Sequence, residues 1–258
     1  MKLLRSVCMA FLMYSHIPVP LVEWREENMA YAMCFFPLVG VIEGAALLLW
    51  CWLCGVLGIG AFLFAAGAAL LPVAVNGGIH MDGFCDCCDA LASHQTKERK
   101  LEIMKDSGAG AFAVICCCAY FLLLAAFWSE CARELSTMLA LAVIPVLSRA
   151  FSGLAVVSFR SARTGGLLAT FSKAAQTKSV RVVMVLWLCL CAAAAVCAQL
   201  VAGAALIVAG LAFFAFYRCF AYRQFGGITG DTAGWFLQLC ELICLAAAVL
   251  AQKIAAIV

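Results

Sequence analysis

Four ionisable side chains stand close together between residues 76 and 91, directly after a long apolar run. They are His80, Asp82, Asp86 and Asp89. At about 100° per residue along a helix, the three aspartates fall within roughly 60° of one another. Carboxylates crowded on one stripe repel, so they need a cation or a proton between them. The pattern predicts a metal site, and the alternative is a solvated amphipathic helix.

The type of side chain indicates which metal this site would bind. Hard cations such as Mg²⁺ prefer carboxylate oxygens and keep several waters, which leaves positions for phosphate oxygens. We therefore expect Asp82, Asp86 and Asp89 to bind Mg²⁺. Gly77 and Gly78 precede them and allow a sharp turn out of the apolar run.

The composition places this site in a membrane protein. Hydrophobic residues make up 67% of the chain and charged residues 12%, and the mean hydropathy is +1.07. Soluble domains have roughly 45–50% apolar and 25% charged residues, and a span needs about 20 mostly apolar residues. The sequence predicts one membrane domain over residues 1–258 with spans at about 30–54, 56–75, 109–128, 136–158, 181–200, 203–222 and 236–256.

We expect an all-α polytopic fold, a bundle of about seven transmembrane helices with short interfacial helices. Residues 7–21 contain prolines and suit an interfacial or re-entrant segment, and residues 96–105 form an amphipathic pattern. Most of the 17 lysines and arginines fall on the side of the predicted bundle that carries the N-terminus and the polar motifs. By the positive-inside rule this side faces the cytoplasm. The net charge of +3 does not indicate nucleic-acid binding.

Further polar residues follow on the same side. Lys105 and Asp106 end the amphipathic segment, and Asp106 either caps the next span or supplies a further carboxylate. Arg149 lies within a predicted span, where an arginine is costly and normally has a partner. It either snorkels or pairs with an aspartate, or, like Arg160 and Arg163 in the following loop, it binds phosphate oxygens.

A glycine-rich turn precedes the last span, and it contains Gly227, Thr229, Gly230 and Asp231. Backbone N–H groups in such a turn can bind a phosphate, although Asp231 could instead be the N-cap of the last helix. Together, the acidic segment, the arginines and this turn predict phosphoryl transfer. That chemistry needs metal ions and arginines to offset the charge on the transferred group.

Three motifs, which follow one another along the chain, are similar to those of a known family. Residues 77–91 read GGIHMDGFCDCCDAL, residues 101–107 read LEIMKDS, and residues 226–234 read GGITGDTAG. They resemble the corresponding motifs of cobalamin synthase, the adenosylcobinamide-GDP ribazoletransferase family. The similarity covers nearly the whole chain. Gly108 and Gln238 depart from the family pattern, which usually has arginine and glutamate at these positions.

The resemblance implies transfer of adenosylcobinamide phosphate from adenosylcobinamide-GDP to α-ribazole or α-ribazole 5′-phosphate, with release of GMP and dependence on Mg²⁺. It implies a bacterial or archaeal cytoplasmic membrane, with the active site facing the cytoplasm. Self-association and association with other cobalamin-assembly enzymes stay open. We assign catalysis to His80, Asp89 and Asp106, metal binding to Asp82, Asp86 and Asp89, and substrate or phosphate binding to Lys105, Arg149, Arg160, Arg163, Gly227, Thr229, Gly230 and Asp231.

Two other functions share some of these sequence features. CDP-alcohol phosphotransferases also use clustered aspartates at a membrane face, but their aspartate spacing differs from that of Asp82, Asp86 and Asp89. An ion-coupled transporter would carry acids near the middle of the membrane, on inverted repeats. The polar residues here gather at one face, and the sequence shows no convincing repeat.

Overall fold

The structure is a computed structural model of the chain, and it describes residues 2–106, 108–165 and 167–257. The described residues form thirteen α-helices and no β-strand, which confirms the predicted all-α fold. In chain order the helices are α1 (Lys2–Tyr14), α2 (Glu26–Met29), α3 (Ala32–Val56), α4 (Ala61–Asn76), α5 (Ile79–Ala92), α6 (Lys97–Ile103), α7 (Ala111–Ser129), α8 (Leu135–Leu141), α9 (Ile144–Ser158), α10 (Leu167–Ala174), α11 (Thr177–Ala198), α12 (Leu200–Phe225) and α13 (Gly230–Ala255).

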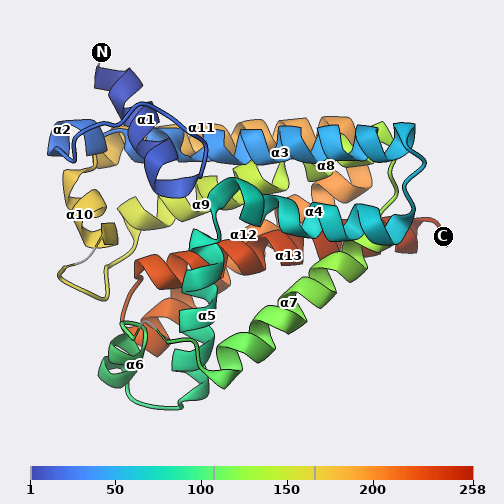
Figure 1. Cartoon of the computed structure of the whole chain (residues 1–258). Helices are drawn as coiled ribbons and strands as arrows, with labels where there is room; N and C mark the ends of the chain where they lie inside the picture. Colours follow the sequence, from blue (N-terminus) through green and yellow to red (C-terminus); the bar gives the residue numbers. More distant parts are fainter. Residues whose placement is uncertain (1, 107, 166, 258) are drawn as a thin grey trace.

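Six segments of the described chain are long and apolar enough to cross a membrane. They are α3, α7, α8 continued by α9, α11, α12 and α13. The predicted span at 56–75 corresponds to α4, which bends by 100° into α5. In Figure 1, α4 runs alongside α3, whereas α5 runs across the direction of both. We therefore treat α5 as a helix outside the membrane-spanning segments.

Helices α9 and α13 form the centre of the bundle. In the apolar stretch of the α8–α9 span, 83% of the residues are buried inside the protein, and in that of α13 the share is 72%. The corresponding share is 22% in α7 and in α11. The outer helices therefore offer most of their surface to lipid, while α9 and α13 face other helices. Polar side chains on the two central helices can find partners inside the protein.

A buried ion network joins the central helices. Arg149 of α9 is fully buried, and its guanidinium donates to Glu43 of α3 at 2.5 Å and to Glu241 of α13 at 2.9 Å. It also donates to the carbonyl oxygen of Pro145 at 2.9 Å, and the hydroxyl of Ser148 donates to Glu241 at 2.8 Å. A charge within a membrane is costly unless it is paired. The network therefore determines which faces of α3, α9 and α13 meet.

The same network reaches the break between α4 and α5. The side-chain amide of Asn76 donates to Glu43 at 3.3 Å, and its oxygen accepts the N–H of Gly78 at 2.9 Å. Gly77 and Gly78 have φ angles of +67° and +79°, in the left-handed region that favours glycine. The predicted glycine turn is confirmed, and it redirects the chain into α5.

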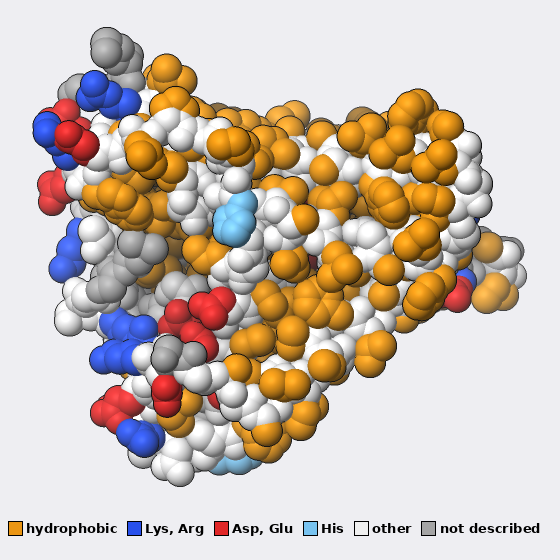
Figure 2. Space-filling model, in the orientation of Figure 1, with side chains coloured by type: hydrophobic (Ala, Val, Ile, Leu, Met, Phe, Trp, Pro, Cys, Tyr) orange, Lys and Arg blue, Asp and Glu red, His pale blue; other side chains and the backbone are white. Residues whose placement is uncertain are grey.

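Charged side chains gather at one end of the molecule. Figure 2 shows basic and acidic groups at the end where α2, α6 and α10 lie, whereas the rest of this face is mostly hydrophobic. Helix α6 lies within the predicted amphipathic segment 96–105. The predicted segment 7–21 divides, because α1 ends at Tyr14 and residues 15–25 form no helix. The short helices α2, α6 and α10 therefore lie at the charged end of the molecule.

Replacing Arg149 by methionine would leave two buried carboxylates without their cation. We expect the thermal unfolding midpoint of the detergent-solubilised protein to fall sharply, because breaking a buried ion pair costs about 3–5 kcal/mol. Arg133→Met is the matched control, since Arg133 is exposed and donates to the carbonyl oxygen of Ile59. An Arg149→Met protein that unfolds at the wild-type temperature would show that the network does not hold the bundle together.

Candidate functional site

The first turn of α13 is at the centre of the polar site. The hydroxyl of Thr229 accepts the N–H of Thr232 at 3.1 Å, and the hydroxyl of Thr232 accepts the N–H of Thr229 at 2.8 Å. This reciprocal capping box starts the helix at Gly230, ahead of the predicted start of the span at residue 236. Thr229, and not Asp231, is therefore the N-cap. The carboxylate of Asp231 faces the neighbouring segments instead.

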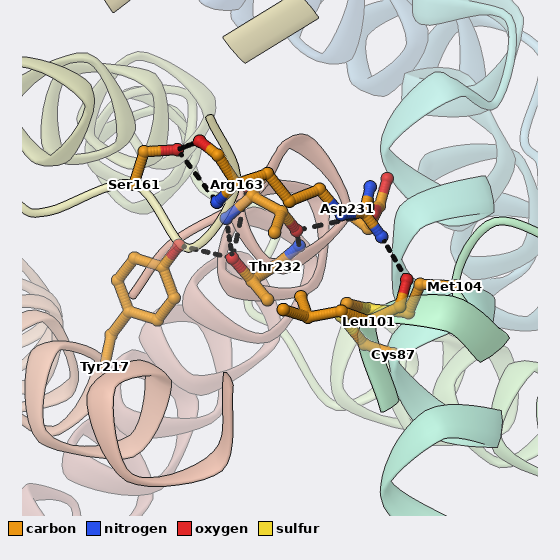
Figure 3. Close-up of polar contacts among 9 residues, drawn as sticks. Cys87, Leu101, Met104, Ser161, Arg163, Tyr217, Asp231 and Thr232 are labelled. Atoms are coloured by element: carbon orange, nitrogen blue, oxygen red, sulfur yellow. Dashed lines mark hydrogen bonds and ion pairs between the residues drawn. The ribbon is translucent and has the colours of Figure 1, made fainter. Parts of the chain in front are cut away.

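Arg163 connects this turn to α6. Its guanidinium forms an ion pair with Asp231 at 3.3 Å and donates to the carbonyl oxygen of Leu101 at 2.7 Å (Figure 3). The hydroxyl of Thr229 donates to the same oxygen of Asp231 at 3.3 Å. The Nε–H of Arg163 is buried and has no hydrogen-bond partner among the described residues. A planar guanidinium with an unused donor suits phosphate oxygens.

Pairing of two backbone segments brings Arg163 to α13. Ser161 and Ile228 form an isolated parallel bridge, and the amide of Ile228 donates to the carbonyl oxygen of Arg160 at 2.9 Å. A Cβ on Gly227 would lie 2.4 Å from that same oxygen. Glycine is therefore required at position 227 for the two segments to approach.

Helix α5 crosses α13 at two glycines. A Cβ on Gly83 would lie 2.9 Å from the Cα of Asp231, and a Cβ on Gly234 would lie 2.8 Å from the carbonyl oxygen of His80. Real side chains do not approach backbone atoms so closely. The absence of both side chains thus lets α5 rest directly on the first turns of α13, which places Asp82 beside that turn.

Aspartates from both helices make this side of the site acidic. Asp82, Asp86 and Asp89 come from α5, and Asp231 comes from α13. Partial burial and the negative charges of the other three carboxylates raise the pKa of Asp86 to about 6, although Arg163 acts in the opposite direction. A carboxyl group whose ionisation is disfavoured by its neighbours would be stabilised as a carboxylate by a nearby cation.

The donor set fits a magnesium ion better than a fully protein-bound metal. In the described residues, no three histidine, cysteine, aspartate or glutamate side chains converge on one point. Mg²⁺ is usually bound by one or two carboxylates and completed by water and substrate phosphates. Asp82 and Asp86 lie one turn apart on α5 and provide such a pair of carboxylates.

Asp89 has a structural role. One carboxylate oxygen accepts the N–H of Gly110 at 2.6 Å, and the other accepts the N–H of Ala113 at 2.8 Å. The first N–H groups of a helix lack partners within it, so Asp89 caps α7 from a neighbouring helix. Of the two roles left open for Asp106, a cap of the next span or a further carboxylate, the structure excludes the cap, because Gly110 is the N-cap of α7. Asp106 is exposed, and its carboxylate accepts the N–H of Gly108 at 3.3 Å.

A cavity of about 220 Å³ lies beside these groups. Its acidic end is formed by Asp82, Asp231 and Arg163, and its other end is formed by apolar and aromatic side chains. Six of the predicted site residues line it: His80, Asp82, Arg163, Thr229, Gly230 and Asp231. The structure therefore brings together residues that are up to 151 positions apart in the chain, between His80 and Asp231.

Other predicted site residues do not line this cavity. They are Asp86, Asp89, Lys105, Asp106, Arg149, Arg160 and Gly227. Arg149 is committed to the ion network, and the guanidinium of Arg160 donates to the carbonyl oxygen of Gly226 at 2.7 Å and 3.0 Å. The aromatic wall of the cavity, which includes Tyr14, Phe36 and Phe171, was not predicted. In a chain this apolar, those residues cannot be distinguished from ordinary core.

Comparisons with known proteins agree with the motifs. The sequence profile of the family described as cobalamin-5-phosphate synthase matches residues 6–249. A protein named adenosylcobinamide-GDP ribazoletransferase from Lachnoclostridium phytofermentans is 44% identical over 98% of this chain and 97% of its own. A protein of the same name from Clostridium botulinum is 31% identical, over 96% and 98%. One from a Geobacillus species is 32% identical, over 85% of each chain. No solved structure matches this chain.

The crossing of α5 and α13 can be tested by adding one methyl group. Gly83→Ala should lower the thermal unfolding midpoint, because an overpacked contact costs about 1–3 kcal/mol. Gly55→Ala is the control, since a Cβ there meets no described atom within 4 Å. Equal stability of Gly83→Ala and the wild-type protein would contradict the close crossing.

The role of Asp89 can be separated from that of its neighbour. Asp89→Ala removes both acceptors for the first turn of α7, and we expect a loss of about 0.5–2 kcal/mol in the free energy of unfolding. Asp86→Asn should leave that energy unchanged or raised in magnesium-free buffer near neutral pH, because it removes a carboxylate that its neighbours repel. Denaturant titrations of both variants measure the difference. A stable Asp89→Ala protein would contradict the cap.

Proposed function

The chain belongs to the cobalamin-5-phosphate synthase family, and we propose that the cavity beside Asp82 and Asp231 performs the ribazoletransferase reaction for which its relatives are named. The reaction is the final step of cobalamin assembly. A ribose hydroxyl of the α-ribazole acceptor forms a bond to the cobinamide-side phosphorus of adenosylcobinamide-GDP. The bond from that phosphorus to the oxygen of GMP breaks, and the hydroxyl proton passes to a carboxylate at the acidic end of the cavity.

The observation that carries this assignment is the position of Arg163. Its guanidinium is held at the cavity by Asp231 and by the carbonyl oxygen of Leu101, while its Nε–H has no partner among the described residues. An arginine that is already oriented needs little rearrangement to bind a phosphate. The N-terminus of α13 lies at the same end of the cavity and favours negative charge.

Magnesium binding fits the acidic side of this site. Asp82 and Asp86 would hold the ion, and Asp231 keeps Arg163 in place opposite them. When bound, Mg²⁺ supplies positive charge that offsets the charge of the diphosphate. Partial burial and the neighbouring carboxylates raise the pKa of Asp86, and a bound cation would stabilise its charged form.

The location follows from the distribution of charge. The chain is a membrane protein, and we place it in the cytoplasmic membrane with the cavity facing the cytoplasm. Most basic residues of its loops lie at the end of the molecule that carries the cavity, in agreement with the positive-inside rule. Self-association and contacts with other cobalamin-assembly enzymes stay predictions.

The buried acids do not favour a transporter. Glu43 and Glu241 lie on spanning helices, as the acids of an ion pathway would, but both carboxylates are bound by Arg149. The cavity is instead lined at its acidic end by the carboxylates and the arginine that phosphoryl transfer needs. The spacing of the aspartates also differs from the CDP-alcohol transferase pattern.

The detergent-purified protein should release GMP from adenosylcobinamide-GDP and α-ribazole when Mg²⁺ is present, and chelation of the metal should abolish the reaction. Asp82→Asn should lower kcat by about 100-fold or more, because removing one electrostatic contribution to a transition state costs that much. Glu134→Gln, at an exposed position at the start of α8, is the control.

Two results would count against the assignments separately. A folded wild-type protein that forms no GMP with Mg²⁺ would overturn the function. Full activity of Asp82→Asn would overturn the metal assignment while leaving the transferase function intact.

A further inference from the structure

The cavity has a second end that phosphoryl transfer does not use. It is lined by Tyr14 and Met33, by Phe36 and Phe171, and by Leu168. Met33, Phe36 and Phe171 are each no more than 2% exposed. We propose that this aromatic end binds the planar base of the acceptor, the dimethylbenzimidazole of α-ribazole, and that His80 hydrogen-bonds the free ring nitrogen of that base. The proposal rests on the ribazoletransferase function given above.

His80 is the polar group that points to a ligand here. It is 5% exposed, and its Nε2 atom is buried without a hydrogen-bond partner among the described residues. A buried polar atom left without a partner costs roughly 1–3 kcal/mol. The imidazole ring lies 6.0 Å from the ring of Tyr14 and 5.8 Å from that of Phe36, measured between centroids. Its unused hydrogen bond is therefore located at the aromatic wall.

The shape of the wall suits a flat aromatic ligand. Tyr14 and Phe36 lie 4.2 Å apart, and the hydroxyl of Tyr14 donates to the sulfur of Met33 at 3.7 Å. This contact gives the hydroxyl of Tyr14 a partner inside the protein, so the half-buried tyrosine offers its ring to the cavity. Aromatic pairs contribute about 0.5–1.5 kcal/mol beyond the area they bury.

The polarity of this end discriminates between the two aromatic bases in the reaction. Guanine carries several donors and acceptors on its edges, and each would need a partner when buried. The polar side chain that lies against the rings of Tyr14 and Phe36 is that of His80. Dimethylbenzimidazole in the nucleoside has two methyl groups and one free ring nitrogen that accepts a hydrogen bond. One donor from His80 satisfies it, and the remainder of the base is apolar.

The position of His80 also determines how the α-ribazole acceptor is oriented in the cavity. His80 lies two residues before Asp82 on α5, and both line the cavity. A base held against His80 places its ribose toward Asp82 and Asp231, where the attacking hydroxyl is needed. His80 thus acts as a positioning and binding residue for the acceptor, and not as the catalytic residue that the sequence suggested.

The test is titration calorimetry of the detergent-purified full chain with α-ribazole, without the cobinamide donor. We expect His80→Phe to raise the Kd for α-ribazole about tenfold, the scale of one lost buried hydrogen bond. His80→Gln keeps an N–H donor and should retain part of the affinity. The wild-type protein should bind the α-linked adenine nucleoside at least tenfold more weakly than α-ribazole, because adenine buries additional polar atoms.

Phe36→Leu removes one wall of the aromatic end and should also raise the Kd for α-ribazole. Phe64→Leu is its matched control, since Phe64 is equally buried but packs against Trp128 outside the cavity. If Phe36→Leu does not fold, the two His80 variants and the nucleoside comparison still decide the question.

Steady-state kinetics separate this proposal from its alternatives. The expected result is a raised KM for α-ribazole in His80→Phe, with the KM for adenosylcobinamide-GDP unchanged. A fall in kcat with an unchanged Kd for α-ribazole would make His80 a proton-transfer residue and overturn the base site. A raised KM for the donor alone would assign the aromatic end to guanine and also overturn it. If the wild-type protein binds α-ribazole but forms no GMP, the transferase function fails, and calorimetry alone decides the binding site.

Discussion

The buried charge of Arg149 constrains the whole bundle. Because the interior of a bilayer offers no water to solvate a guanidinium, its helix must lie beside helices that supply acceptors. Glu43 and Glu241 supply them, and Glu43 also accepts from Asn76 at the end of α4. The position of one cation thereby determines the mutual placement of three spanning helices and of the point where α5 begins. The site at the membrane face therefore depends on an ion network that does not itself line the cavity but lies against Phe36, which does.

The placement of α5 then creates the acidic site. A helix that continued α4 through the membrane would bury Asp82 and Asp86 in lipid, which is prohibitively costly. The left-handed glycines at 77 and 78 turn α5 across the bundle, so its aspartates lie beside the first turn of α13. There the positive end of that helix and Arg163 offset part of their charge. The contact at Gly83 keeps this distance short.

The sequence predicted features whose cause is local. Spans follow from runs of apolar residues, the break before α5 follows from two adjacent glycines, and helix α6 follows from its amphipathic pattern. Features that depend on distant partners were not predictable. The pairing of Arg149 with Glu241 joins residues 92 positions apart, and the contact of Asp89 with α7 depends on how two helices meet. By residue type, Arg149 could bind phosphate and Asp89 could bind a metal or act in catalysis, and their neighbours in space show that both make structural contacts instead.

The first turn of α5 contributes to both ends of the cavity, through His80 and Asp82. Asp82, Asp86 and Asp89 share one face of this helix. On the other, His80, Met81, Phe84 and Cys87 are buried against the bundle. One short helix at the boundary of the membrane can therefore offer charge to a phosphate and apolar surface to an aromatic base at the same time. A nucleoside acceptor has this same division between a polar ribose and a flat apolar base, so a cavity lined by the first turn of α5 matches it in polarity.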